Sequence, residues 1–402
     1  MSTSMQAEPA APDAAYDFDA IRAAEFPGLG DGIFLNAASY GPLPQRALSA
    51  VGDHDRRHAA AQLTESDFSP PLAAARGAIA DLIGAKTREI ALAPNTNVGI
   101  NLAAAMVRQI VQKGDTRKTI LVSHSEFPAN VYPWLALEAC GLHVKFIDTD
   151  KLGCLREDAL IEQINSGDVI AVAISAVQFA SGFRADLARV SEACKAADVF
   201  IAVDAIQMIG AVPFNIGDMH IDVLACGAQK WLCSPYGTGF ARIAPRWIDE
   251  LQPDLPGWLA YESSYDYTKL VNYDPKLWHD ARRFEVGTLA FQSFAGLTES
   301  VDLFCEIGVA NIWERIKLLQ QPLIEFATEN KKKITVVSPL DEQHRSGIIA
   351  MRMPDNGLSY TALRIAGVTC SIRENALRLA PHFYNTPEEM ERVVRVLSRS
   401  MT

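Results

Sequence analysis

The segment from Val199 to Phe240 reads VFIAVDAIQMIGAVPFNIGDMHIDVLACGAQKWLCSPYGTGF. Two apolar stretches in it are predicted to be buried strands: the first ends at Asp204, and the second is followed by Lys230 in a polar turn. In an open parallel sheet, residues at the carboxyl ends of the strands point into the ligand crevice. Asp204 and Lys230 are therefore expected to share one site, either as a structural ion pair or as catalytic groups.

The chain around this segment alternates between strand-like and helix-like stretches. The predicted strands are Thr119–Ser123, His143–Asp148, Val169–Ser175, Val199–Asp204, Asp222–Cys226 and Gly239–Ile243. Helical periodicity falls before or between several of them, as in Asn97–Gln112 and Ala185–Ala197. Such alternation predicts an α/β fold with a mostly parallel sheet, and the continuous apolar strands indicate that helices flank both of its faces.

Three parts are expected along the chain. Residues 1–30 are predicted to be a leader and a helix that packs with the small domain, residues 31–270 a large domain, and residues 271–402 a small C-terminal α+β domain. Two strands of that small domain are expected at Ile334–Val337 and Ile348–Arg352. A terminal helix should begin after Thr386, because Pro387 suits the first helical position and Glu389 completes a capping box.

Composition excludes several classes of function. The 402 residues include 37 Lys and Arg against 48 Asp and Glu, a net charge of −11, which argues against nucleic-acid binding. No apolar run reaches the length of a membrane span, so no membrane association is expected. The seven cysteines form no CxxC pair, which favours a reducing, cytoplasmic location, and the eight histidines show no spacing typical of a metal site.

A lysine and an aspartate that share a site are also the pair with which enzymes hold pyridoxal 5′-phosphate (PLP). The motifs LNAASYGPLP, APNTNVGINL, SEFPANVYPW, SAVQFASGFRADL, AVDAIQ, GAQKWL, RFEVGT and RLAPHFYNT follow one another in this order. In this the chain resembles the class V aminotransferase superfamily of fold-type I PLP enzymes, which includes cysteine desulfurases, kynureninase and isopenicillin-N epimerase-like proteins. The resemblance runs from Phe34 to the terminal helix and implies a PLP-binding large domain and a homodimer with shared active sites.

The resemblance also implies roles for individual residues. Lys230 would hold PLP as a Schiff base and move the proton at the substrate Cα, while Asp204 would keep the pyridine nitrogen protonated. Gln207 would hydrogen-bond the phenolic oxygen, and Phe127 would stack on the ring. The remaining cofactor contacts that it implies are Thr96, Asn97, Gln178, Gln229 and, toward the phosphate of the neighbouring subunit, Thr288.

On the substrate side, the resemblance implies that Arg378 binds the α-carboxylate and that Asn36 lines the substrate entrance. Arg373 is either a helper of Arg378 or a solvated loop residue. Two positions depart from the pattern of the desulfurases, which carry a serine where this chain has Gly227 and a histidine where it has Gln229. The phosphate is therefore expected to depend more on backbone groups, Thr96 and Thr288.

Three functions remain open on the sequence alone. The first is a PLP-dependent aminotransferase or C–S lyase that acts on an α-amino acid. The second is a cysteine desulfurase that uses Cys370 as its nucleophile, although Cys370 precedes Arg378 too closely for a long mobile loop and is expected to be structural. The third is a non-catalytic binding protein that keeps the fold, against which the presence of Lys230, Asp204 and Arg378 argues.

Overall fold

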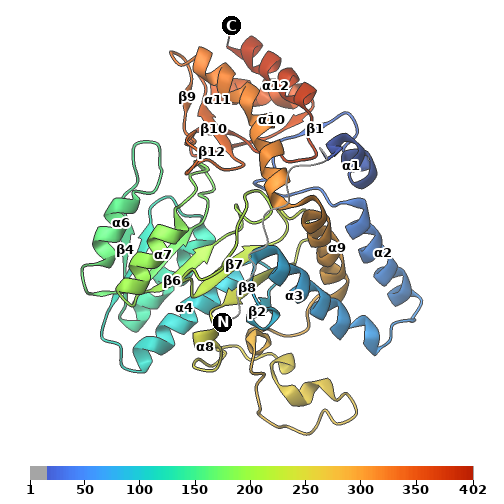
Figure 1. Ribbon diagram of the computed structural model, residues 1–402, viewed down its shortest axis with the longest axis vertical. Helices are drawn as coiled ribbons and strands as arrows, with labels where there is room; N and C mark the ends of the chain where they lie inside the picture. Colours follow the sequence, from blue (N-terminus) through green and yellow to red (C-terminus); the bar gives the residue numbers. More distant parts are fainter. Residues whose placement is uncertain (1–15, 402) are drawn as a thin grey trace, which may run out of the picture.

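The computed structural model describes residues 16–401, so residues 1–15 of the expected leader lie outside the described part. Its centre is a seven-stranded sheet in the order β2-β8-β7-β6-β5-β3-β4 (Figure 1). The strands are β2 (Ile90–Leu92), β3 (Thr119–Ser123), β4 (His143–Ile147), β5 (Val169–Ser175), β6 (Phe200–Asp204), β7 (Val223–Gly227) and β8 (Gly239–Ile243). Only β8 runs antiparallel to its neighbours, which confirms the mostly parallel α/β sheet.

Helices flank both faces of this sheet because its strands are apolar on both faces. All seven residues of β5 are buried. Val172 and Ile174 belong to a core that includes α3 and α9, whereas Ala171 and Ala173 belong to a second core with α4.

The helices of the described residues are α1 (Phe18–Glu25), α2 (Gln45–Ala59), α3 (Ser69–Ile83), α4 (Thr96–Gln112), α5 (Tyr132–Leu135), α6 (Glu157–Ile164), α7 (Leu187–Ala196), α8 (Pro245–Ile248), α9 (Phe291–Ile307), α10 (Val309–Glu329), α11 (Asn356–Ile365) and α12 (Pro387–Ser400).

A second, antiparallel sheet has the order β12-β13-β10-β9 and lies above the central sheet in Figure 1. Its strands are β9 (Thr335–Val336), β10 (Ile349–Arg352), β12 (Ser371–Arg373) and β13 (Ala376–Leu379). One face packs on α10, α11 and α12 through residues such as Met351, Leu377 and Leu379. Beside it, β1 (Ile33–Phe34) pairs with β11 (Val368–Thr369) and ties the start of the chain to this part.

The ends of the described chain meet in the same region. The capping box of α12 forms as predicted, with the Thr386 side chain accepting from the Glu389 backbone and the Glu389 carboxylate accepting from the Thr386 backbone. Glu389 also forms an ion pair with Arg22 of α1, and Arg22 donates to the carbonyl of Tyr384.

Helix α9 packs against α2 and α3, at the flank of the central sheet (Figure 1). Leu297 of α9 and Ile79 of α3, for example, share one hydrophobic core. The division of the chain at residues 270 and 271 stays a prediction. No helix within residues 16–401 is long and apolar enough to cross a membrane.

Candidate active site

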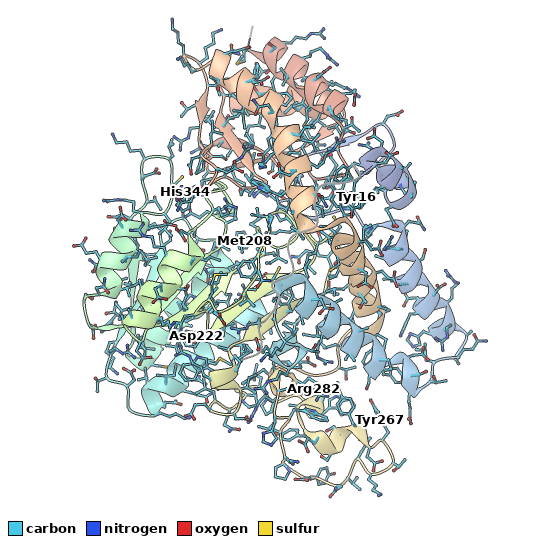
Figure 2. All side chains as sticks on the ribbon, in the orientation of Figure 1. Tyr16, Met208, Asp222, Tyr267, Arg282 and His344 are labelled. Atoms are coloured by element: carbon cyan, nitrogen blue, oxygen red, sulfur yellow. The ribbon has the colours of Figure 1, made fainter. Side chains whose placement is uncertain are left out.

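Polar side chains gather where the central strands end. Ser175 closes β5, Asp204 closes β6 directly beside it, and Lys230 follows β7 by three residues. Parallel strands bring their carboxyl ends to one edge, so the turns that follow them line one crevice. In Figure 2, Met208, which follows β6, lies on the side of this edge, whereas Asp222, which precedes β7, lies at the opposite side of the sheet.

The Lys230 side chain is only partly accessible to solvent. Its Nζ lies 5.6 Å from the centroid of the Phe127 ring. Burial lowers the pKa of Lys230 to about 8, an effect that the charge of Asp204 opposes and the charges of Arg378 and Arg373 reinforce. The ordinary value is near 10.5, so a far larger fraction of this amine is neutral at physiological pH than in water.

Two buried carboxylates lie near one another at this edge. Asp204 accepts a hydrogen bond from the backbone of Ile206 at Oδ1, and no residue within 16–401 donates to its Oδ2. Glu126 accepts from the Ser175 backbone and hydroxyl and from Asn130. Burial raises the pKa of Asp204 to about 6 and that of Glu126 to about 7, and the charge of Asp204 adds to the second shift. The Oδ2 atom of Asp204 is left to accept a hydrogen bond from a cationic group.

A small cradle forms between the end of β7 and the start of α4. The backbone N–H of Gly227 donates to the Thr96 hydroxyl oxygen over 2.8 Å. A Cβ at Gly227 would lie 2.6 Å from Oε1 of Gln229 and 3.1 Å from Oγ1 of Thr96, so a larger residue there would displace the Gln229 side chain. Thr96 is the first residue of α4, where the backbone N–H groups have no partner within the helix and favour an anion.

One other predicted residue near this cradle, Asn97, is engaged in contacts of its own. Asn97 is exposed, and its side chain donates to the carbonyl of Ala129 and accepts from Asn101. Its backbone N–H and one N–H of its amide are left for a ligand at the start of α4.

The amides of Gln207 and Gln178 also have partners in the protein. Gln207 donates to the carbonyl of Ala38 and accepts from the indole of Trp231, which leaves one N–H of its amide for a ligand. Gln178 donates to Ser123 and accepts from the backbone of Leu155, so it links the segment after β5 to the end of β3 and to the segment before α6. No contact joins Gln178 to Lys230 within residues 16–401.

Arg378 is the most buried cation of the site, with 2% of its surface exposed. Its Nε donates to the Ser371 hydroxyl, one terminal nitrogen to the carbonyl of Phe179, and the other to the Ser39 hydroxyl. A guanidinium has five N–H groups, so each terminal nitrogen keeps one. No carboxylate within residues 16–401 pairs with Arg378, and burial together with the charge of Arg373 lowers its pKa to about 9.

Asn36 reaches this arginine through one intermediate. The Ser39 hydroxyl donates to Oδ1 of Asn36 and accepts from Arg378, so the three residues form a chain of hydrogen bonds. The ring of Phe127 lies 5.4 Å from that of Phe179 in an edge-to-face arrangement, and the carbonyl of Phe179 accepts from Arg378. The structure thus brings Lys230, Asp204, Phe127, Arg378 and Asn36 to one place.

Thr288 lies apart from these residues. Its exposed side chain accepts a hydrogen bond from the indole of Trp258 and has no contact with Lys230. The turn that carries Thr288 is nevertheless well anchored, because Glu285 forms a buried bidentate ion pair with Arg76 and accepts from the backbone of Leu92.

Several residues were missed by the sequence analysis. Glu126 could have been found, because it directly precedes Phe127 after a predicted strand. The carbonyl of Phe179 gave no signal, since any residue type offers a backbone carbonyl. His382 is fully buried, donates from Nε2 to the carbonyl of Trp231 and accepts at Nδ1 from the Phe383 backbone. It thus ties the segment after β13 to the residue next to Lys230.

Cys370 lies between β11 and β12 and is 5% exposed. Its side chain belongs to the apolar core of the small sheet, and burial raises its pKa to about 12. The turn between β12 and β13 consists of Glu374 and Asn375, both with left-handed φ, of 43° and 59°. Such a tight hairpin offers no mobile loop, so Cys370 has neither the thiolate nor the freedom of a nucleophile.

Comparisons with known proteins show what this chain is similar to in sequence and in fold. A sequence profile described as "Aminotransferase class-V" matches residues 33–392. The chain is 29% identical to an uncharacterized aminotransferase, YcbU, of Bacillus subtilis over 80% of this chain and 81% of the relative. It is 26% identical to a probable cysteine desulfurase of Methanothermobacter thermautotrophicus over 91% and 94% of the two chains. The solved structure of a cysteine desulfurase from Thermococcus onnurineus superposes with a TM-score of 0.80 at 22% identity, over 94% and 97% of the chains.

Proposed function

This chain belongs to the aminotransferase class-V family, and we propose that Lys230 is the residue with which it holds PLP and acts on an α-amino acid. The members of that family are PLP-dependent transferases or lyases. The observation that carries the assignment is the position of the Lys230 amine, 5.6 Å from the centroid of the Phe127 ring and within the field of Asp204 and Arg378.

The residues around Lys230 fit the cofactor part by part. The unused oxygen of Asp204 suits a protonated ring nitrogen, and the exposed Phe127 ring suits a stacked heterocycle. The Thr96 hydroxyl, the start of α4 and the Gly227 backbone suit a phosphate. PLP, when bound, supplies an electron sink that makes the substrate Cα–H bond acidic.

The protein's own groups then have distinct tasks. A neutral Lys230 amine can take the proton from Cα and return it elsewhere, and its lowered pKa keeps it available near neutral pH. The two free N–H groups of Arg378 bind the α-carboxylate in a bidentate fashion, while Ser39, Ser371 and the Phe179 carbonyl fix the guanidinium plane.

We propose that the reaction is transamination or elimination, and not sulfur transfer through Cys370. The buried thiol on a tight strand junction supports this choice. The seven free cysteines also support a reducing, cytoplasmic environment.

A homodimer with shared active sites is part of the proposal. Exposed apolar side chains, among them Leu255 and Val286, line a hollow of about 680 Å³ beside α4. Thr288 lies two residues beyond Val286 on the anchored turn, where a second copy of the chain could receive it. If so, co-expression of Lys230→Ala and Thr288→Ala should restore activity in mixed dimers, because one of the two sites then carries neither change.

The experiment that tests the central assignment is Lys230→Ala. The variant should fold, lose on the order of 10⁴-fold in turnover, and carry no cofactor on that position after borohydride reduction and peptide mapping. Lys332→Ala, at an exposed lysine, is the matched control. Reductive labelling of the variant at the same level as the wild type would contradict the proposal.

A further inference from the structure

One face of the β12–β13 hairpin carries two arginines. Ser371 pairs with Arg378 and Arg373 pairs with Ala376, and residues directly opposite in an antiparallel ladder point to the same side. Residues two apart on one strand also share a side. The four side chains of Ser371, Arg373, Ala376 and Arg378, called the hairpin face below, therefore point together, with Arg373 and Arg378 as diagonal neighbours.

The hairpin face is directed toward the large domain. The Arg378 guanidinium donates to the Phe179 carbonyl and the Ser39 hydroxyl, both outside the small sheet. Ala376 packs in a small cluster with Val337 and Ala350, against which Leu152 lies. The charges of Arg373 and Arg378 both act on Lys230, so the two arginines lie on the side of the candidate active site.

Neither arginine is neutralised by the protein. No carboxylate within residues 16–401 forms an ion pair with Arg373, which donates only to the neighbouring carbonyl of Ile372. Asp150, in the loop that carries Leu152, accepts from the backbone of Leu152 and Cys154. Two adjacent cations that repel one another are costly, and the missing partner is an anion from outside the chain.

We propose that the amino-acid substrate carries a second anionic group on its side chain, which Arg373 binds while Arg378 binds the α-carboxylate. This inference rests on the proposed function, because it takes Arg378 as the α-carboxylate site. One carboxylate occupies the two free N–H groups of Arg378. Arg373 uses one of its five N–H groups within the protein, so four are left for a second anion. The chemical class is an α-amino acid whose side chain ends in a carboxylate, sulfinate or similar anion.

The first test measures binding without reaction. Thermal unfolding of the holoenzyme is followed with succinate or glutarate and with the matched monocarboxylates propionate and butyrate at equal concentration. A ligand that binds the folded state raises its stability by mass action, so the dicarboxylates should raise the Tm more than the monocarboxylates. Arg373→Gln should remove this difference, whereas Arg364→Gln, at an exposed arginine of the same small domain, should keep it. No advantage of dicarboxylates in the wild type would overturn the proposal.

The second test compares substrates. For aspartate, glutamate and cysteine sulfinate, kcat/KM should exceed that for asparagine, glutamine and alanine by about ten- to hundredfold, as expected for one charged hydrogen-bonded contact. Arg373→Gln should abolish this preference. An equal fall for acidic and neutral amino acids would mean that both arginines share the α-carboxylate, and it would overturn the proposal.

The two tests also separate this inference from the proposed function. Dicarboxylates have no amino group, so their binding does not require Lys230 chemistry. If the dicarboxylate effect persists in a protein that turns over no amino acid, the anion site stands and the function fails. If amino acids react without an acidic preference, the function stands and the second anion site fails.

Discussion

The two walls of the candidate active site differ in where their charges find partners. On the wall formed by the strand ends of the central sheet, Asp204 and Lys230 lie within each other's field. On the hairpin face of the small sheet, Arg373 and Arg378 have no carboxylate within residues 16–401. The first wall is thus organised before any substrate arrives, whereas the second is completed by the substrate. The variants below test this difference.

The largest effect is expected from Asp204→Asn. An amide cannot balance the positive charge of a protonated ring nitrogen, so turnover should fall by about 10³-fold, which corresponds to about 4 kcal/mol. The loss should be the same for amino acids and for simple amines, because this wall does not contact the carboxylate. Steady-state kinetics with both substrate classes measures it, with the exposed Asp218→Asn as control. Near-normal turnover would show that the carboxylate is structural.

Arg378→Ala should give a smaller and selective effect. Loss of one partner of a desolvated charge pair should lower kcat/KM for amino acids by about 3 kcal/mol, or more than a hundredfold. Simple amines have no carboxylate and should be much less affected. Arg378→Lys should recover only part of the loss, because an ammonium cannot make the bidentate contact. Equal losses for amines and amino acids would erase the distinction between the two walls.

The pH dependence of stability tests the lowered pKa of Lys230 directly. Its pKa is lowered to about 8 from 10.5, so the folded protein disfavours the charged amine. This cost is fully present below pH 8 and disappears as pH rises toward 10.5, where the unfolded chain also loses the proton. Cofactor-free Lys230→Met should therefore have a higher Tm than the cofactor-free wild type at pH 7, and the difference should shrink by pH 10. A constant difference in calorimetric scans would argue against the lowered pKa.

The smallest effect on activity is expected from Cys370→Ser. The thiol lies in the apolar core behind the hairpin face, so turnover should stay within about twofold, while the buried hydroxyl should cost about 1–3 kcal/mol of stability. Chemical denaturation and steady-state assays measure the two effects, with the exposed Cys305→Ser as control. Loss of persulfide formation from cysteine in this variant would instead support the desulfurase hypothesis, in which Cys370 is the nucleophile.

The same contrast explains how much could be predicted from the sequence. Asp204 ends one apolar strand and Lys230 follows another, so the local pattern predicted the meeting of these residues at the edge of the sheet. It also predicted six of the seven strands of the central sheet, but it missed the short strand β2. Two of the three partners of Arg378 come from positions 339 and 199 residues away, and one of these is a backbone carbonyl. The folded chain alone brings such groups together, and the internal contacts of Gln178 and Gln207 were equally hidden.

The hydrogen bond from His382 to the carbonyl of Trp231 has a mechanical consequence. It fastens the segment that follows β13 to the backbone beside Lys230. Arg378 lies four residues before His382, and Arg373 pairs with Ala376 further out along the hairpin. The attachment lies closer along the chain to Arg378 than to Arg373, so it restrains the position of Arg378 relative to Lys230 more directly.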